Sequence, residues 1–363
     1  MPQGIPPGVP CSCLHSCKYD DLSASLPAKP QLQTLIPPMR LLAIFFNLFE
    51  PLFKFAQRVL GHSRIGWMFV GPNLLVIAVF TFLPIVINVA YALTGGVNLM
   101  PAQRPYAGME NFSILLECRD YLDLQTCRKD VFWRALFNTV RFSAIQVVLM
   151  VLFSLVTALV LNRKIIGRGF WRGVFFYPVL LSPVVVALIW KWLLQTQGVF
   201  NAVLVSAGTG PVEWLTDAQW AFFWTIFVSI WAHMGFYTLI LLAGLQAIPK
   251  DMYEAAELDA ASPWRVLYRI TLPLLVPNLI VVLVLALIRA VQIFDEVFVL
   301  TGGGPGSATT FIVQFIYQTG FAEQIHLYGL AAAASLLLAA GLVILTLLQL
   351  RLTRAEQSGQ RAR

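Results

Sequence analysis

Six long apolar stretches constrain this chain more than any other feature of its sequence. They lie at about 67–93, 137–161, 172–194, 220–246, 273–299 and 327–350. Each can cross a bilayer as an α-helix, which takes about 20 apolar residues. Only 12% of the residues are charged, against about 25% in an ordinary soluble domain. The sequence therefore predicts an all-α polytopic membrane protein with six spans and excludes a water-soluble globular fold.

The basic residues between these stretches predict the orientation of the chain, because cytoplasmic connections carry an excess of Lys and Arg. One alternating set of segments holds 17 basic residues and the other holds 5. The rich set comprises Lys18, Lys29, Arg40, Lys54, Arg58, Arg64, Arg163, Lys164, Arg168, Arg172, Lys250, Arg265, Arg269, Arg351, Arg354, Arg361 and Arg363; the poor set comprises Arg104, Arg119, Arg128, Lys129 and Arg134. We therefore expect a multi-pass protein of the cell (inner) membrane with both termini cytoplasmic.

The segments outside the spans differ in character. Residues 1–40 are rich in Pro, Ser and Cys and lack a sustained apolar period, which predicts a disordered cytoplasmic tail. Residues 41–64 place polar side chains three or four apart among Phe and Leu, which predicts an amphipathic interfacial helix. A further span is the alternative there, and Pro51 counts against it. Residues 65–134 hold the first span and an external loop, and residues 351–363 form a cytoplasmic tail.

The five cysteines fall into two groups. Cys118 and Cys127 lie in the predicted external loop, where an oxidising compartment would let them pair. Whether they form a disulfide stays open at this point. Cys11, Cys13 and Cys17 have a spacing that fits no zinc pattern, so we expect reduced thiols in the tail and no metal site.

The fourth connection carries a short helical pattern. Glu254 to Ala261 is rich in Ala, with acids expected in its first turn, and Pro263 follows as a breaker or as a second helix start. The small side chains suit a helix that seats in a groove of another protein. The alternative is an ordinary loop helix that packs on its own bundle.

This run resembles the cytoplasmic EAA loop of binding-protein-dependent ABC import permeases, whose pattern is EAA, three residues, G, nine residues, I, x, LP. The family's Gly is replaced by Ala260, which still fits a close helix contact but lacks the access of glycine to positive φ. The resemblance implies coupling to an ATPase through Glu254, Ala255, Ala256, Asp259, Ala260, Ile270, Leu272 and Pro273.

A second block points to the carbohydrate branch of that family. Residues 294–305 resemble the FDxxxxLTGGGP signature of sugar and glycerol-phosphate permeases, and Tyr317 and Phe321 continue the match. Upstream, residues 175–178 and 187–192 resemble the FxxP and ALIWKW stretches of these permeases, and all the blocks follow one another in the family's order. Together the blocks cover residues 135–350, so the resemblance implies a six-span type I ABC importer transmembrane core that moves a sugar or sugar-like solute.

The same resemblance implies the partners of the chain: a second permease subunit that we expect to be a different chain, a dimer of ATPase subunits and an external solute-binding protein, with no nucleic acid. The sequence contains no GxxxxGK[ST] motif. We therefore expect no enzymatic activity and no cofactor on this chain, with ATP and Mg on the partner ATPase.

Ionisable residues within the spans are candidates for the solute path, because charge in hydrocarbon is costly. Arg289, Gln292 and either Asp295 or Glu296 would share one face of a continuous fifth span. Such a stripe either hydrogen-bonds sugar hydroxyls or forms an internal ion pair, and both interpretations stay open. His233, with Tyr237 one turn further on, is likewise either a helix-packing group or a pathway group.

A secondary transporter or channel that works alone is the alternative function, and an intramembrane hydrolase is a third. The sequence shows no internal repeat and no coupling acids at mid-span for the former. It contains no HExxH or GxSxG motif for the latter. The sequence therefore favours an importer permease subunit.

Overall fold

The computed structural model describes residues 65–121, 123–163 and 165–361. The predicted tail 1–40 and the predicted interfacial helix 41–64 lie outside these residues. The chain divides into two units, Met1–Thr81 and Phe82–Arg363, and each is described by itself. Every regular element in the described residues is helical.

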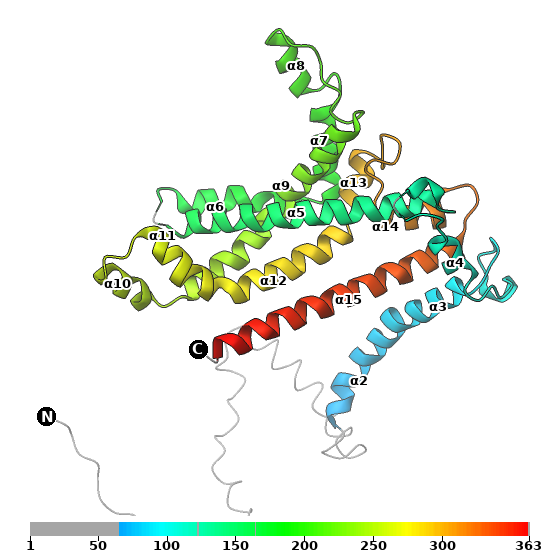
Figure 1. Cartoon of the computed structure of the whole chain (residues 1–363), viewed down its shortest axis with the longest axis horizontal. Coiled ribbons are helices and arrows are strands. Elements are labelled where there is room, and N and C mark those ends of the chain that lie inside the picture. The colour runs from blue at the N-terminus through cyan, green and yellow to red at the C-terminus, as the bar shows by residue number, and fades with distance from the viewer. Residues whose placement is uncertain (1–64, 122, 164, 362–363) are drawn as a thin grey trace, which may run out of the picture. The chain divides into compact units, whose positions relative to one another are not determined.

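Figure 1 labels the helices along the chain. The first unit contributes α2 (Ile65–Ile77), and η3 (Ala78–Phe82) crosses into the second. The second unit continues with α3 (Leu83–Ala92), η4 (Pro101–Gln103), α4 (Glu110–Leu116), η5 (Leu124–Thr126), α5 (Asp130–Asn162), α6 (Arg168–Phe176), η6 (Tyr177–Leu180), α7 (Pro183–Leu194), α8 (Val199–Ser206), α9 (Ala218–Ala247), α10 (Lys250–Leu258), α11 (Pro263–Val266), η7 (Leu267–Thr271), α12 (Leu272–Val291), α13 (Asp295–Leu300), α14 (Ile312–Tyr317), η8 (Gln318–Ala322) and α15 (Tyr328–Arg361).

The described residues contain six helical segments that are long and apolar enough to cross a membrane. They are Val70–Ala92, Asp130–Asn162, Pro183–Ser206, Ala218–Ala247, Pro263–Val291 and Tyr328–Arg351. The predicted six-span, all-α fold class is confirmed.

The predicted third span, a single helix over 172–194, is wrong. The structure breaks this region into α6, the 3-10 turn η6 and α7, and the membrane-crossing candidate continues instead through α8 to Ser206. Pro178 and Pro183 explain the break, because proline lacks an N–H donor and pushes the preceding residue out of the helical region. Ser182, before Pro183, is accordingly extended with ψ of 136°.

The predicted fifth span, 273–299, is also wrong at both ends. Helical structure runs from Pro263 through the π-helical turn η7 and α12 to Val291, where it stops. The π turn precedes Pro273, whose ring would clash with the carbonyl four residues back in a regular helix. The π turn η3 precedes Pro84 in the same manner.

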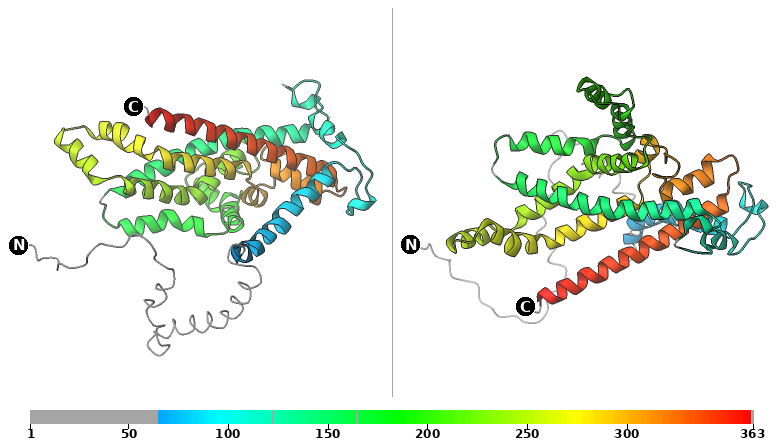
Figure 2. Two further views of the ribbon diagram at one scale, coloured as in Figure 1. Left: turned by 90° about the horizontal axis from the view of Figure 1, so that it is seen from below. Right: turned by 45° about the horizontal axis from the view of Figure 1, so that its top comes forward.

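The core of the second unit lies among α5, α9 and α12, which pack against one another (Figure 1). Figure 2 shows the same helices from two further directions. Phe142 of α5 lies at the centre of this core, with its ring centroid 4.9 Å from that of Phe311. Gly235 lets α9 approach the end of α6 closely, because a Cβ at this position would meet the carbonyl oxygen of Phe175.

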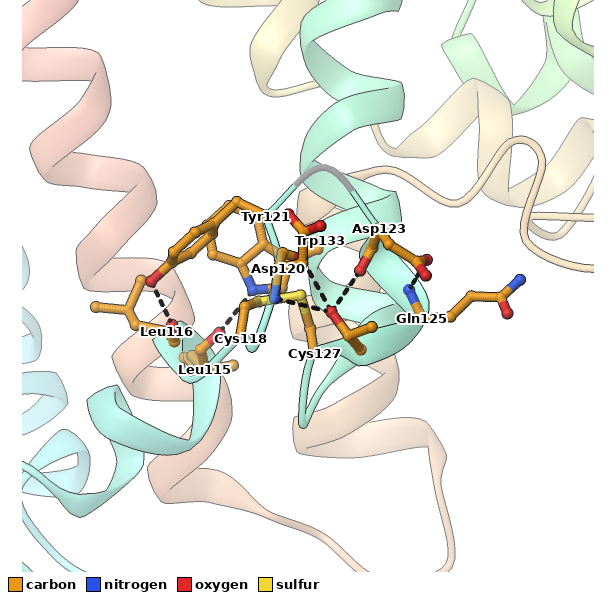
Figure 3. Close-up of a disulfide and its surroundings, with 10 residues drawn as sticks. Leu115, Leu116, Cys118, Asp120, Tyr121, Asp123, Gln125, Cys127 and Trp133 are labelled. Carbon is orange, nitrogen blue, oxygen red and sulfur yellow. Dashed lines mark hydrogen bonds between the residues drawn. A yellow bond between two sulfur atoms is a disulfide. The ribbon is translucent and has the colours of Figure 1, made fainter.

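The loop between α3 and α5 is held together by a disulfide between Cys118 and Cys127 (Figure 3). Trp133 at the start of α5 packs beside the disulfide and donates a hydrogen bond from Nε1 to the Leu115 carbonyl at 3.0 Å. The Tyr121 ring makes an edge contact with Trp133 at 5.4 Å between centroids. The loop is therefore anchored to the first turn of α5.

Arg104 organises the other end of this loop. It is 7% exposed, and its guanidinium donates to the Asn98 carbonyl at 2.7 Å and to Thr94 Oγ1 at 2.9 Å. Burial lowers the pKa of Arg104 from its ordinary value, and nearby Tyr91 and Tyr328 act in the opposite direction. Arginine remains protonated in proteins, so Arg104 is a fixed positive charge.

Candidate functional site

Three predicted solute-path residues meet where α12 ends and α13 begins. The Arg289 guanidinium and the His233 ring lie in hydrogen-bond contact, with 3.0 Å between Nη2 and Nε2. Glu296 lies behind both side chains: its Oε2 is 4.0 Å from Arg289 Nη2, and its Oε1 is 3.9 Å from His233 Nδ1. Helices α9, α12 and α13 thus bring one cation, one imidazole and one carboxylate together. We call these three residues the polar group.

The hydrogen bonds assign a protonation state to His233. A guanidinium can only donate, so His233 Nε2 must accept from Arg289. His233 Nδ1 then carries the proton and donates to the Ser229 carbonyl at 2.9 Å. Arg289 and Glu296 contribute side chains of opposite formal charge to the polar group.

Glu296 is the most enclosed member of the polar group, with 3% of its surface exposed, whereas the Arg289 side chain is 43% exposed. Glu296 Oε1 has no hydrogen-bond partner among the described residues. A buried carboxylate is costly unless a positive charge compensates it. Glu296 therefore acts as the fixed counter-charge that holds Arg289 at the surface of the site.

A cavity of about 380 Å³ opens beside the polar group and matches the size of small-molecule sites in proteins, which start at about 300 Å³. Apolar side chains form most of its wall, and polar groups line one side, as is typical of such sites. The lining residues are Pro178, Val179, Leu181, Pro183, Val186, Ala232, His233, Phe236, Tyr237, Leu285 and Arg289.

The predicted stripe over Arg289, Gln292 and Asp295 or Glu296 is wrong as a continuous helical face. The helix stops at Val291, and Phe294 has a non-helical backbone with φ of −148° and ψ of −63°. Gln292 and Asp295 are exposed, and neither lines the cavity. The break turns Glu296 inward instead, toward Arg289 and His233 of neighbouring helices.

The LTGGGP block forms the loop between α13 and α14 and is held against α5. Asn138 of α5 donates to the Ser307 carbonyl at 2.8 Å, and Thr139 Oγ1 accepts from the Ile312 N–H at 2.9 Å. Gly303 has a φ of +94°, and a Cβ there would lie 2.6 Å from Gln314 Nε2. The sequence gives no signal for these two α5 residues, because the contacts join segments far apart in the chain.

The helix of the EAA loop is α10, and it runs over Lys250–Leu258 rather than over the predicted Glu254–Ala261. The first turn holds Asp251, so Glu254 lies in the middle of the helix and not in its first turn as predicted. Pro263 begins the next helix, α11, as one of the two expected alternatives.

Ala260 adopts the left-handed conformation with φ of +49°, although alanine disfavours it. The Ala261 N–H donates to the Ala256 carbonyl at 2.9 Å, and the Ala260 N–H donates to the Glu257 carbonyl at 3.0 Å. This pair of bonds is the Schellman cap, whose left-handed position is usually glycine. Ala260 therefore forms the left-handed turn that glycine would form at this position in the family pattern.

One side of α10 faces the bundle and the other is open. Ala256 is buried, whereas Glu254, Ala255 and Asp259 are exposed and Leu258 is 89% exposed. These exposed residues form the open surface of α10. Ile270, Leu272 and Pro273 are partly buried and lie away from this surface, in η7 and the start of α12.

A hydrogen bond ties α10 to the helix that leads into the membrane. Tyr253 Oη lies 3.3 Å from Thr271 Oγ1, and Thr271 is 5% exposed. Helical structure continues from Thr271 to Val291, passes through Arg289 of the polar group and ends four residues before Asp295. One helical segment therefore connects the contact with α10 to Arg289 at the cavity.

We expect Tyr253→Phe to weaken this connection while preserving the fold, because a single neutral hydrogen bond contributes about 1 kcal/mol. Stimulation of the partner ATPase by external solute should fall, and the amount of protein in the membrane should stay near wild type. The matched control is Tyr268→Phe, which alters an exposed tyrosine on the neighbouring turn. Equal stimulation in Tyr253→Phe and Tyr268→Phe would contradict a role for this bond.

The chain is similar to known proteins over most of its length. Residues 130–356 match the family described as binding-protein-dependent transport system inner membrane component. The chain belongs to this family. The matched region begins with α5 and includes both the EAA loop and the polar group, so these two features lie within the part shared by family members.

Relatives of this family member cover most of its length. The trehalose/maltose transport system permease protein MalF of Thermococcus litoralis is 37% identical over 80% of this chain and 94% of its own. The lactose transport system permease protein LacF of Rhizobium radiobacter is 31% identical over 78% of this chain and 92% of its own. A bacterial ABC transporter involved in the import of the acidic polysaccharide alginate matches with a TM-score of 0.69 and 25% identity, covering 84% of this chain and 99% of the other.

Proposed function

We propose that this chain is the transmembrane permease subunit of an ATP-driven importer that moves a sugar or sugar-like solute across the cell membrane. The observation that carries the proposal is the family match over residues 130–356 together with the relatives named for sugar transport. The cavity beside the polar group supplies a compartment of suitable size between the spans. Within it, Arg289 and His233 offer polar contacts for hydroxyl groups.

ATP binding and hydrolysis belong to a partner subunit in this proposal, because the sequence contains no phosphate-binding loop motif. The exposed side of α10 docks to that ATPase through Glu254, Ala255, Leu258 and Asp259. A second permease subunit completes the membrane part. An external solute-binding protein delivers the sugar, as a periplasmic protein accompanies the alginate transporter in its solved complex.

The end of the unit that carries α10 faces the cytoplasm, and the disulfide loop faces outside. The excess of Lys and Arg supports this orientation, and so does the disulfide, which persists in an oxidising compartment.

Cysteine labelling tests the orientation. In a background without free cysteines, a cysteine introduced at Ser307, beside α13, should react with an impermeant maleimide added outside intact cells. A cysteine introduced at Arg168 should react only after the membrane is opened. The reverse pattern would overturn the orientation.

Purification of the chain from its native membrane tests the function. We expect an ATPase subunit, a second permease and a solute-binding protein to co-purify in mild detergent. The Ala260→Trp variant, in which the docking surface is altered, serves as the matched control for the ATPase. A chain that purifies alone and transports solute on an ion gradient would contradict the proposal.

A further inference from the structure

A row of six aromatic side chains leads from the break between α12 and α13 to the end of α3. We call it the aromatic row, and its members are Phe294, Phe298, Tyr317, Phe321, Tyr328 and Tyr91. The Tyr317 ring centroid lies 5.2 Å from that of Phe294 and 5.4 Å from that of Phe298. From Tyr317 the row continues to Phe321, from Phe321 to Tyr328, and from Tyr328 to Tyr91, with 6.2 Å between ring centroids at each step. No element contributes all of these rings.

The two ends of the aromatic row lie at defined places in the fold. Phe294 directly precedes Asp295 at the break between α12 and α13, two residues before Glu296 of the polar group. Tyr328 is the first residue of α15, and Tyr91 is the next to last residue of α3. Figure 1 shows α13, α14, the start of α15 and the end of α3 in the same part of the unit. The row therefore runs from the break between α12 and α13 to the end of α3, where the loop that leads to α5 begins.

The rings of the middle of the row are accessible rather than packed in the core. Phe298 is 39% exposed, Tyr317 is 37% exposed and Phe321 is 65% exposed. Exposed aromatic rings in a membrane protein face lipid, another subunit or an aqueous path. The groups around the row decide among these occupants.

Polar side chains lie near both ends of the aromatic row. At the loop end, Tyr91, Phe321 and Tyr328 line a cavity of about 220 Å³ together with Asn88 and Ser335. The Arg104 guanidinium lies 5.1 Å from the Tyr91 ring centroid. At the other end, Gln292 and Asp295 are exposed. Lipid is a poor occupant for such a surface, because polar groups facing hydrocarbon are costly.

A pyranose ring matches this combination of groups. Its ring faces expose C–H bonds, whereas its rim carries hydroxyl groups. The negative face of an aromatic ring attracts the partly positive C–H hydrogens, and the polar side chains at the ends of the row can bond the hydroxyls. Several rings in succession let a sugar keep one stacking contact while it forms the next.

We propose that the aromatic row is the outer half of the solute path, along which the pyranose rings of the sugar stack in succession before they reach the polar group. This inference rests on the proposed function, because it assigns a place on the chain to the same solute.

The test uses the complete importer, with its partner subunits and binding protein, in proteoliposomes supplied with internal ATP. Radiolabelled maltose, trehalose and lactose serve as probes. Tyr317 and Phe321 are each replaced by Leu and by Met, which keep apolar volume without a ring. Tyr317→Phe and Phe321→Tyr keep the ring. Phe153→Leu removes an exposed ring of α5 outside the row and is the matched control.

We expect the ring-less variants to lower uptake about fivefold to tenfold, the effect of losing one favourable ring contact at the barrier. ATPase activity stimulated by the loaded binding protein should stay near wild type, because docking and hydrolysis do not use these rings. Phe153→Leu should transport at the wild-type rate, and Tyr317→Phe and Phe321→Tyr, which keep the ring, should lower uptake less than the ring-less variants do.

If the ring-less variants take up sugar at the wild-type rate while Arg289→Gln still lowers uptake, the inference about the row is wrong and the proposed function is unaffected. Loss of the second permease from the complex in both the Leu and the Met variants would identify the row as a subunit interface and would also overturn it. Absence of ATP-dependent uptake of every probe by the wild-type complex would instead contradict the proposed function, and the inference with it.

Discussion

Glu296→Ala should strongly lower sugar uptake by this chain in its complex. Removal of Glu296 leaves Arg289 without its counter-charge, and breaking a buried pair costs about 3–5 kcal/mol. The cost here lies near or below the lower end of that range, because 43% of the Arg289 side chain is exposed to solvent, which screens its charge. We expect both a smaller amount of complex and a loss of uptake per complex.

A double variant separates the structural role of this pair from its role in transport. In Glu296→Gln combined with Arg289→Gln, both charges are absent and no unpaired charge remains, so the amount of complex should recover. Uptake per complex should stay low, because the guanidinium that faces the cavity is missing. Glu110→Gln, a substitution of an exposed acid in α4, is the control. Full recovery of uptake in the double variant would show that the pair serves folding alone.

Ala260→Trp should abolish association with the ATPase, whereas Ala260→Gly should strengthen the loop. The left-handed conformation of Ala260 costs about 1–2 kcal/mol relative to a residue without Cβ. Glycine removes most of that cost, and tryptophan keeps it while adding bulk beside the exposed Leu258. Pull-down of the ATPase and solute-stimulated hydrolysis, at matched permease levels, measure the effect.

Ala255→Gly supplies the matched control for the glycine substitution. Ala255 lies inside α10 in a regular helical conformation, where glycine costs about 0.5–1 kcal/mol. The two alanine-to-glycine variants should therefore shift the melting temperature of the complex in opposite directions. A decrease in both variants would contradict the account of the cap, and unchanged association in Ala260→Trp would remove α10 from the coupling.

The sequence was sufficient to predict the number of spans, because each apolar stretch is long enough to cross a bilayer regardless of its neighbours. The breaks within those stretches were harder to predict. Pro178 and Pro183 signal the interruption between α6 and α7, yet prolines also occur inside α2 and α12, where the helix continues. Only packing against neighbouring helices decides between a kink and a break.

The polar group shows a different limit of sequence reasoning. The adjacent acids Asp295 and Glu296 are typical of a helix start, so a break before α13 could have been found. The meeting of Glu296 with His233 could not, because it depends on how α9 packs against the α12 to α13 break. At Ala260, intrinsic backbone preference opposed the turn, and the hydrogen bonds of the cap and the connection to α11 outweighed it.

Uptake of radiolabelled maltose, trehalose and lactose into proteoliposomes tests the central claim most directly. The vesicles contain the complete complex, the solute-binding protein lies outside, and ATP is either sealed inside or omitted. We predict uptake of at least one sugar only with internal ATP, and its loss when the complex carries Arg289→Gln. Uptake that proceeds without ATP, or that is driven by a proton or sodium gradient, would contradict the account.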